Sequence, residues 1–243
     1  MVLEHGVLTE PTALRGQTVV AISPHPDDAV WSCGGYLAAL VRNGTRALVL
    51  TVFDGDSLRS DRGIGRERRA EDLRATARIG VDRVSLGFPD AAYRGYTSPL
   101  ARLRTPQPKD DALTQTIAAA MVEILSAADQ VLMPVADGTH VDHVLTRRAV
   151  TRCAAVPVSW ELTGYAEFPY RLPTAPAGRP IMVPFQPWLE ASLEYTSQIS
   201  VMFGSASSFE AKLRERYLAS EEKAEWVPYA FTSRTSHPRQ MTS

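Results

Sequence analysis

Two short runs of histidine and aspartate hold the side chains best suited to chemistry. One reads His-Pro-Asp-Asp at positions 25–28, and the other reads His-Val-Asp-His at positions 140–143. Imidazole nitrogens and carboxylate oxygens are ligands that suit zinc, and a catalytic zinc site uses three protein ligands and leaves a fourth position to water. The two runs together therefore predict a catalytic metal site.

Three of these side chains supply a complete set of ligands. His25 and His143 would contribute two nitrogens, and Asp28 would contribute one oxygen. A zinc ion held in this way lowers the pKa of its water from ~16 toward ~7, so hydroxide forms near neutral pH without a nucleophilic side chain. Sites of this kind also accept iron(II), cobalt(II) or manganese(II), so the residues alone leave the metal open.

The remaining polar side chains of the two runs fit proton transfer. Asp27 is adjacent to the ligand Asp28 and points elsewhere, so it could take a proton from the attacking water as a general base. His140 could protonate the departing amine or stabilise the tetrahedral oxyanion, and Asp142 could orient His140. Such a site hydrolyses amides or esters, and phosphoesters less readily, depending on the pocket around it.

Structural interpretations of the same residues explain less of the pattern. A pair of aspartates is usually exposed to solvent, and Asp28 could simply stabilise the amino end of a following helix through the helix dipole. That interpretation leaves His25 and the two later histidines without a role. Gly34 and Gly35 invite comparison with a dinucleotide-binding loop, but no Gly-x-Gly-x-x-Gly pattern follows the first strand, so no nucleotide cofactor is predicted.

Short apolar runs alternate with helical patterns along the chain, which predicts an α/β fold with a parallel sheet covered on both faces. Strands are expected at 18–23, 47–53, 83–87, 130–135 and 156–162, and helices at about 30–42, 65–79, 111–127, 144–155 and 207–226. In the common doubly wound order 3-2-1-4-5, strands one and four are neighbours at the switch point of the sheet. The two polar runs should therefore meet at the carboxyl ends of those strands.

Several local features complete the expected arrangement. Leu73 and Ala77 are spaced for burial on the second helix, and Ser208 could cap the last one. Long aperiodic loops in compact domains are more often functional than idle, so 88–109 is expected to overhang the site. The chain is interpreted as one domain, 1–243, with a motif-bearing core over about 18–200 and a C-terminal helix and frayed tail over 207–243.

The composition of the 243 residues excludes several classes of protein. The 26 basic and 27 acidic side chains leave a formal charge of -1, so no net field attracts nucleic acid or an anionic membrane. The amino terminus lacks the pattern of a secretory signal, and no stretch approaches the ~20 apolar residues of a membrane span, so a cytoplasmic protein is expected. Cys33 and Cys153 stand far apart, so neither a disulfide framework nor a thiolate zinc site is predicted.

The ordered set of motifs resembles the LmbE-like family, also called the PIG-L deacetylase family. Positions 25–28 resemble its His-Pro-Asp-Asp motif, and 140–143 resemble its His-Pro-Asp-His motif with Val141 in place of proline. Further matches follow the family's order: Arg68 and Glu71 for Arg-x-x-Glu, 86–90 for Leu-Gly-x-x-Asp, 165–170 for Tyr-Glu-Asp-x-Pro-Tyr, and 195–198 for Tyr-x-Ser-Gln. The resemblance covers about 19–198.

The resemblance implies a Rossmann-like, three-layer α/β zinc hydrolase with the same ligands, base and acid that the residues themselves suggest. It further implies that Arg68 and Asp90 contact the hydroxyl groups of a sugar. Their structural alternatives are a helix surface for Arg68 and a turn cap for Asp90. Deacetylases of this family act on sugar amides in thiol cofactors, lipid anchors and antibiotics, so a small sugar-like molecule is the expected partner. The oligomeric state is left open.

Two positions depart from the family's pattern. Ala29 stands where the commonest amino-terminal motif continues with glutamate, and Gly138 stands where some members carry a tyrosine two residues before the second motif. Position 138 offers no hydroxyl to stabilise an oxyanion, so that task would pass to His140, to zinc or to another group.

Three hypotheses for the function follow. The first is a zinc-dependent N-deacetylase of an amino sugar or a glycosylated metabolite. The second keeps the zinc site but cleaves a larger amide, as in amidases of thiol-sugar conjugates. The third is a binding or regulatory protein on the same fold that has lost turnover, for which Ala29 and Gly138 are the only hints. The intact set of ligands and base favours hydrolysis.

Overall fold

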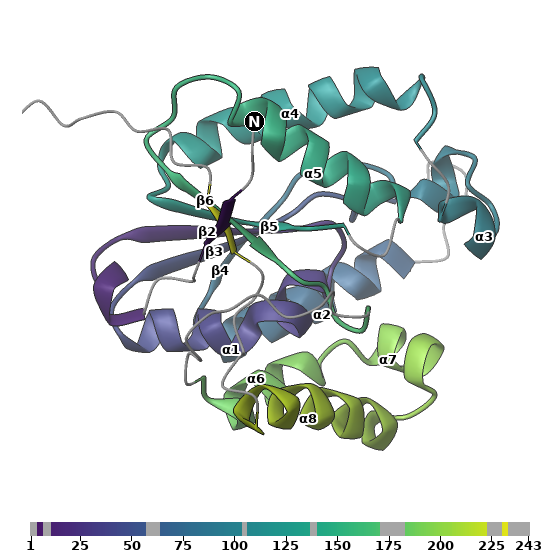
Figure 1. The fold of residues 1–243 in the computed structure, drawn as a ribbon. Coiled ribbons are helices and arrows are strands. Elements are labelled where there is room, and N and C mark those ends of the chain that lie inside the picture. The colour runs from purple at the N-terminus through teal and green to yellow at the C-terminus, as the bar shows by residue number, and fades with distance from the viewer. Residues whose placement is uncertain are drawn as a thin grey trace, which may run out of the picture.

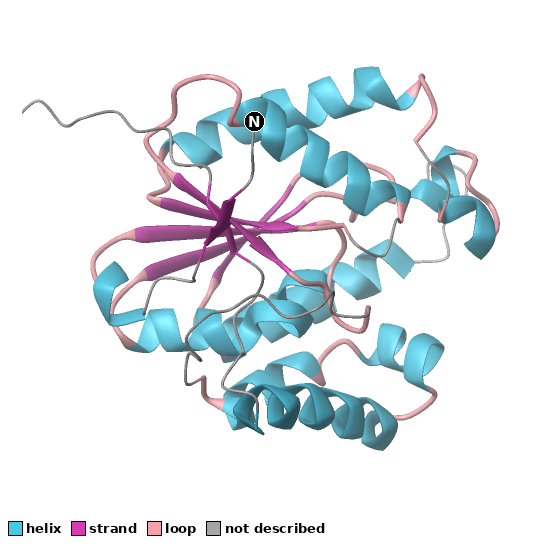
Figure 2. Ribbon diagram, in the orientation of Figure 1, coloured by secondary structure: helices cyan, strands magenta, loops and turns pink. Residues whose placement is uncertain are grey.

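A five-stranded sheet forms the centre of the molecule in the computed structural model (Figure 1, Figure 2). The structure describes residues 4–6, 11–56, 64–103, 106–136, 140–170, 183–222 and 230–232. The strands of this sheet are β2 (Thr18–Ser23), β3 (Arg46–Thr51), β4 (Asp82–Ser85), β5 (Gln130–Pro134) and β6 (Glu161–Tyr165). They lie in the order β4-β3-β2-β5-β6 and all pair in parallel, which confirms the predicted order 3-2-1-4-5.

The central strand β2 is buried on both of its faces. Val19 and Ala21 belong to the hydrophobic core on one side of the sheet, whereas Val20 and Ile22 belong to the core on the other side. Successive side chains of a strand point to opposite faces, so an unbroken apolar run needs a cover on each. The sequence of β2 therefore requires helices on both sides of the sheet.

Helices supply that cover in two layers. One face carries α1 (Asp28–Arg42) and α2 (Ile64–Arg78), and the other carries α4 (Asp110–Ser126) and α5 (Val141–Cys153) (Figure 1). Outside α1 lie α6 (Phe185–Ser192), α7 (Thr196–Phe203) and α8 (Ala206–Glu222) (Figure 1). The other described elements are η1 (Pro11–Leu14), η2 (Ala91–Arg94), α3 (Pro99–Arg102) and the antiparallel pair β1 (Glu4–Gly6) and β7 (Ala230–Thr232).

The glycine pair inside α1 serves helix packing. A Cβ atom on Gly34 would lie 2.7 Å from Cδ1 of Trp188 on α6, and one on Gly35 would lie 2.9 Å from Val183. The Trp188 indole also donates a hydrogen bond of 2.8 Å to the carbonyl of Val30 on α1. The two glycines thus let α6 approach α1 closely, which accounts for them without a nucleotide.

The predicted position of the last strand is wrong by several residues. The prediction placed it at 156–162, but β6 spans Glu161–Tyr165. Pro157 has no backbone N–H to give to a ladder, and Val156 is 59% exposed, so this apolar stretch remains in the connection before the strand.

The predicted burial of Leu73 and Ala77 on α2 is also wrong. Both side chains are exposed, and the inward face carries Glu71 and Asp72 instead. These acids are buried because neighbouring elements supply donors, such as the hydroxyl of Tyr195, which donates to Asp72 over 2.7 Å. The spacing of apolar residues therefore predicts the wrong buried face when the inward side chains of a helix are polar.

The C-terminal part differs from its prediction in two details. Ser208 lies inside α8 and is not its cap; the hydroxyl of Ser205 accepts a hydrogen bond from the Ser208 N–H over 3.1 Å. Within the predicted tail, β7 pairs with β1, and the remaining tail residues 223–229 and 233–243 lie outside the described part. No helix among the described residues has the length and apolar character to cross a membrane.

Candidate active site

The first polar run forms a turn that is held together by its own hydrogen bonds. The hydroxyl of Ser23, at the end of β2, donates to the His25 carbonyl over 2.6 Å and accepts from the Ala29 N–H over 3.0 Å. The His25 N–H donates to Oδ2 of Asp28 over 2.9 Å. These bonds fix the turn between β2 and α1, so its side chains are positioned before any ligand arrives.

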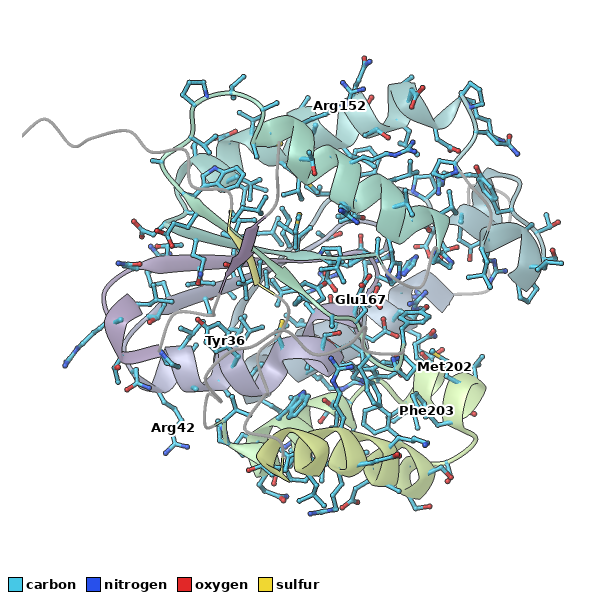
Figure 3. The ribbon with its side chains drawn as sticks, in the orientation of Figure 1. Tyr36, Arg42, Arg152, Glu167, Met202 and Phe203 are labelled. Carbon is cyan, nitrogen blue, oxygen red and sulfur yellow. The ribbon has the colours of Figure 1, made fainter. Side chains whose placement is uncertain are left out.

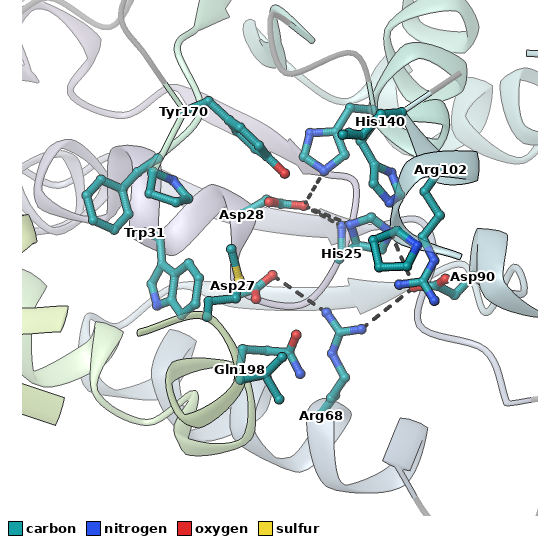
Figure 4. A pocket seen from close by; sticks show the side chains of 17 residues that line it. His25, Asp27, Asp28, Trp31, Arg68, Asp90, Arg102, His140, Tyr170 and Gln198 are labelled. Atoms are coloured by element: carbon teal, nitrogen blue, oxygen red, sulfur yellow. Dashed lines mark hydrogen bonds and ion pairs between the residues drawn. The ribbon is translucent and has the colours of Figure 1, made fainter. Parts of the chain in front are cut away.

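Asp27 sits in this turn with a strained backbone. Its φ of 111° lies in the region that favours glycine, where another residue costs about 1–3 kcal/mol. Although Asp27 is the N-cap residue of α1, its side chain makes no capping hydrogen bond. Its Oδ1 instead lies 3.8 Å from Nη2 of Arg68, at the pocket (Figure 4). Burial, and then the charge of Asp28, raise the pKa of Asp27 to about 8.

The second polar run forms the amino end of α5. The helix begins at Val141, so His140 is the N-cap residue, and its Nδ1 accepts a hydrogen bond of 3.2 Å from the Asp142 N–H. A neutral imidazole that accepts at Nδ1 must carry its proton on Nε2. Burial, together with the nearby His25 and His143, lowers the pKa of His140 to about 3. His140 is therefore a neutral donor at neutral pH.

The two runs converge on the Asp28 carboxylate. Its Oδ2 lies 3.2 Å from Nδ1 of His25 and 3.3 Å from Nε2 of His143, and all three residues are buried (Figure 4). Metal bonds of about 2.0–2.2 Å place neighbouring ligand atoms of a tetrahedron about 3.3–3.6 Å apart. The two distances from Oδ2 to the imidazole nitrogens match this spacing, and the chemistry of the three donors suits a divalent metal such as zinc.

His140 also lies close to this group but is a poor ligand. One nitrogen each of His25, His140 and His143 lie within 4.8 Å of one another. Because Nδ1 of His140 accepts the backbone hydrogen bond, its Nε2 holds the proton and has no lone pair to offer a metal. This difference separates His140 from the other two histidines.

In both His25 and His143, the ring nitrogen that faces away from Asp28 contacts a second carboxylate. Nε2 of His25 is 3.0 Å from Oδ2 of Asp142, and Nδ1 of His143 is 2.6 Å from Oε1 of Glu167. Histidines that bind metals almost always donate their second N–H to such a group, which fixes the tautomer and leaves the other nitrogen free to bind. The two pairs orient both imidazoles toward Asp28.

The carboxylate of Asp142 holds His25, whereas the sequence pattern suggests that it orients His140. Besides His25, this carboxylate accepts hydrogen bonds from the Ala91 N–H over 2.9 Å and from the guanidinium of Arg94. It is the backbone N–H of Asp142 that orients His140. Asp142 is thus a positioning residue for both histidines, through different atoms.

Sequence reasoning missed Glu167 and Arg94. Glu167, just beyond the carboxyl end of β6 (Figure 3), also accepts from the Ala136 N–H over 2.9 Å. Arg94 lies in the long aperiodic loop, where Nη1 donates to Asp110 over 3.2 Å. For Glu167 the signal was the stretch 165–170, which matched a family motif without an assigned role. For Arg94 the sequence holds no comparable signal.

Arg68 and Asp90 lie next to the ligand group, since Oδ2 of Asp90 is 3.5 Å from Nε2 of His25. Nη1 of Arg68 lies 3.8 Å from Oδ2 of Asp90, and Nη2 donates to the Pro26 carbonyl over 3.3 Å. Asp90 also caps η2 by accepting from the Ala92 N–H over 2.8 Å, so the turn-cap interpretation holds as well. The Arg68 side chain is only 16% exposed, which excludes an ordinary helix surface.

These groups line one cavity of about 360 Å³. Tyr170 forms part of its wall, with its ring 5.8 Å from that of His143 and nearly perpendicular to it. Figure 4 shows the Tyr170 hydroxyl pointing toward Asp28. Gly138 lies outside the described residues. Tyr170 is therefore a hydroxyl group near the ligands that the sequence analysis did not single out.

Comparison with protein families gives one match, over residues 20–154, to the PIG-L model, which is described as GlcNAc-PI de-N-acetylase. Among curated proteins, 2'-N-acetylparomamine deacetylase of Streptomyces fradiae is 38% identical over 168 residues. That alignment covers 64% of this chain and 58% of the relative, so the chain spans somewhat over half the length of this protein.

Solved structures of deacetylases share the fold. The A40926 pseudoaglycone deacetylase is 25% identical, with a TM-score of 0.72 over 92% of this chain and 100% of that one. A teicoplanin deacetylase in a zinc-inhibited form is 24% identical, with a TM-score of 0.72 over 90% of this chain and 100% of that one.

Proposed function

The chain belongs to the PIG-L family of GlcNAc-PI de-N-acetylases, and we propose that it is a metal-dependent N-deacetylase of an amino sugar in a glycosylated small molecule. The observation that carries the proposal is the buried group of His25, Asp28 and His143, with a carboxylate behind each histidine. The named relatives act on 2'-N-acetylparomamine and on an A40926 pseudoaglycone, which supports a glycosylated substrate.

His25, Asp28 and His143 would hold the metal, and zinc suits two imidazoles and one carboxylate. When bound, zinc supplies Lewis-acid chemistry that lowers the pKa of water and withdraws charge from an amide carbonyl. Once the imidazoles have lost the protons that a metal displaces, Asp142 and Glu167 would hold them in the tautomer that exposes a lone pair toward the ligand site.

Asp27 serves as the proton carrier of the reaction. As a carboxylate at the pocket wall it takes a proton from the attacking water as the new C–O bond forms. A pKa raised to about 8 makes the ionised form, which predominates above that pH, a stronger base than an ordinary aspartate, so it keeps the proton until the C–N bond breaks and then passes it to the nitrogen. One side chain thereby acts first as base and then as acid, and the products are acetate and a free amine.

His140 stabilises the negative charge that develops on the carbonyl oxygen. Its Nε2–H points a neutral donor into the pocket, and a histidine with a pKa near 3 does not carry the extra proton that a general acid needs. Tyr170 offers a second donor for the same oxygen, in place of the hydroxyl that Gly138 lacks. Arg68 and Asp90, which line the same cavity beside His25, bind hydroxyl groups of the sugar.

The proposal is tested by incubating metal-loaded protein with N-acetylated sugars, their glycosides and larger sugar amides, and measuring newly formed primary amine. We expect release of amine and acetate from N-acetylated glycosides. Asp27→Asn should reduce the rate by the ~10²–10⁴-fold that a general base contributes. Asp111→Asn, on the exposed start of α4, is the matched control and should keep the rate.

Each other outcome has a definite meaning. Cleavage of only the larger amides would show that the same site works as an amidase and not as a deacetylase. Release that Asp27→Asn leaves unchanged would remove Asp27 from the mechanism. Absence of release from every compound, with metal bound, would reject the enzymatic proposal.

A further inference from the structure

Exposed apolar side chains gather at the active-site cavity, next to the polar side chains of Arg102 and Gln198. Three large apolar side chains, beside α3 and on α7, line the cavity, and a fourth stands on α3 next to the lining residue Pro99; we call these four the apolar rim. The rim consists of Leu100 (70% exposed), Leu103 (47%), Val201 (81%) and Met202 (45%). Met202 lies at the edge of the molecule on α7 (Figure 3).

This gathering is unlike the rest of the described surface. Nine large apolar side chains are exposed in the described part of the chain, and four of them belong to the apolar rim. Single exposed apolar residues are ordinary, whereas clustered ones mark binding surfaces. Leu103, Val201 and Met202 line the same cavity as His25 and Asp28, so the cluster is continuous with the proposed reaction site.

Both halves of the rim are fixed by hydrogen bonds. On α3, the Ser98 hydroxyl caps the helix by accepting from the Ala101 N–H over 3.1 Å. On α7, the buried carboxylate of Glu71 accepts from the Ser197 N–H over 2.8 Å and from the Ser197 hydroxyl over 2.6 Å. A rim held in this way is a preformed binding surface.

A substrate made only of hydroxylated sugar would satisfy the polar side chains of the cavity and leave the rim in water. We propose that the apolar rim binds an alkyl or aromatic group attached to the amino sugar, so that the preferred substrate is an amphipathic glycoside. The inference rests on the proposed function, since the polar side chains of the cavity must hold the acetamide and the sugar hydroxyls. Each methylene that leaves water on binding contributes a factor of about three to four in affinity.

The test compares the methyl and hexyl glycosides of N-acetylglucosamine on the metal-loaded protein, below the concentration at which the hexyl compound forms micelles. We expect kcat/KM to be at least tenfold higher for the hexyl glycoside. A lower KM, and not a higher kcat, should account for the difference. In the double variant Leu103→Ser with Val201→Ser, this ratio should fall toward one. Val122→Ser, an exposed apolar residue on α4 and outside the cavity, should keep the ratio.

Dissociation constants for the same two glycosides, measured by calorimetry, separate this inference from the proposed function. If neither glycoside is hydrolysed but the hexyl compound still binds at least tenfold more tightly through the rim, only the proposed function fails. Equal constants for the two glycosides, or a ratio that survives the double variant, would overturn the inference. So would a dimer that forms in wild-type protein and dissociates in the double variant, because the rim would then bind a second copy of the chain.

Discussion

Asp27 combines two features that destabilise the folded state. Its backbone is strained, and its carboxyl group is buried beside the carboxylate of Asp28. Residues held in such conformations cluster at functional sites, where the surrounding structure enforces them. Here the hydrogen bonds of the turn between β2 and α1 hold Asp27 at the pocket wall. The cost is compatible with a catalytic role.

Replacing Asp27 separates the cost of strain from that of charge. Asp27→Ala and Asp27→Gly both remove the carboxylate, but only glycine adopts a φ of 111° freely. We expect both variants to lose activity, and Asp27→Gly to be more stable than Asp27→Ala by about 1 kcal/mol in urea unfolding. Equal stability of the two variants would show that the backbone at position 27 relaxes without strain.

The histidines of the ligand group predict how metal affinity depends on pH. Burial alone would lower the pKa of His25, but its hydrogen bonds to Asp142 and Asp28 raise it to about 9. For His143, Asp28 and Glu167 likewise outweigh burial and raise the pKa well above its usual value. In metal-free protein at neutral pH both imidazoles are therefore protonated, and a metal must displace those protons.

Zinc affinity should consequently rise as the pH is raised from 6 toward 9, and binding should release protons. Calorimetric titrations in buffers of different ionisation enthalpy measure both quantities. Glu167→Gln leaves a weaker partner for His143, so its proton release should be smaller. An affinity that is independent of pH over this range would mean that neither imidazole binds the metal.

At the scale of elements, the helix α7 is held by a buried carboxylate and forms part of the cavity wall. Glu71 on α2 accepts hydrogen bonds from Thr196 and Ser197 at the first turn of α7, and Gln198 of the same helix lines the cavity. The two motifs that contain these residues lie far apart in sequence, and their contact fixes one wall of the site.

Glu71→Ala should destabilise the protein by about 2–4 kcal/mol, because it leaves buried donors of α7 unsatisfied. Since α7 bears cavity residues but no ligand, we expect KM to increase more than kcat decreases. Glu67→Ala, at an exposed position of the same helix, should change stability by less than about 0.5 kcal/mol. A loss of kcat alone would place Glu71 in the chemistry.

The same elements show what sequence patterns predict and what they miss. The turn after β2 and the start of α5 were predictable because polar residues directly follow buried apolar strands. The inward face of α2 was not, because Glu71 and Asp72 are buried against donors from other elements. Arg94 was missed for the same reason, since its partners Asp110 and Asp142 lie in separate elements.

At the scale of the whole molecule, the strand order creates the site. β2 pairs with β5 at the point where the order reverses, so the turn after β2 and the start of α5 open at the same edge of the sheet. This convergence could be inferred before any coordinates, because parallel βαβ units restrict the order of strands. The carboxylates behind the histidines could not, because Glu167 and Asp142 reach them only through tertiary contacts.

The most direct test measures amide hydrolysis while zinc is added to protein freed of metal by chelation. We expect no turnover without metal, a linear rise up to one equivalent of zinc, and no rise in the variant His143→Ala. Turnover that persists after chelation, or a rise that His143→Ala leaves intact, would contradict a hydrolytic site built on His25, Asp28 and His143.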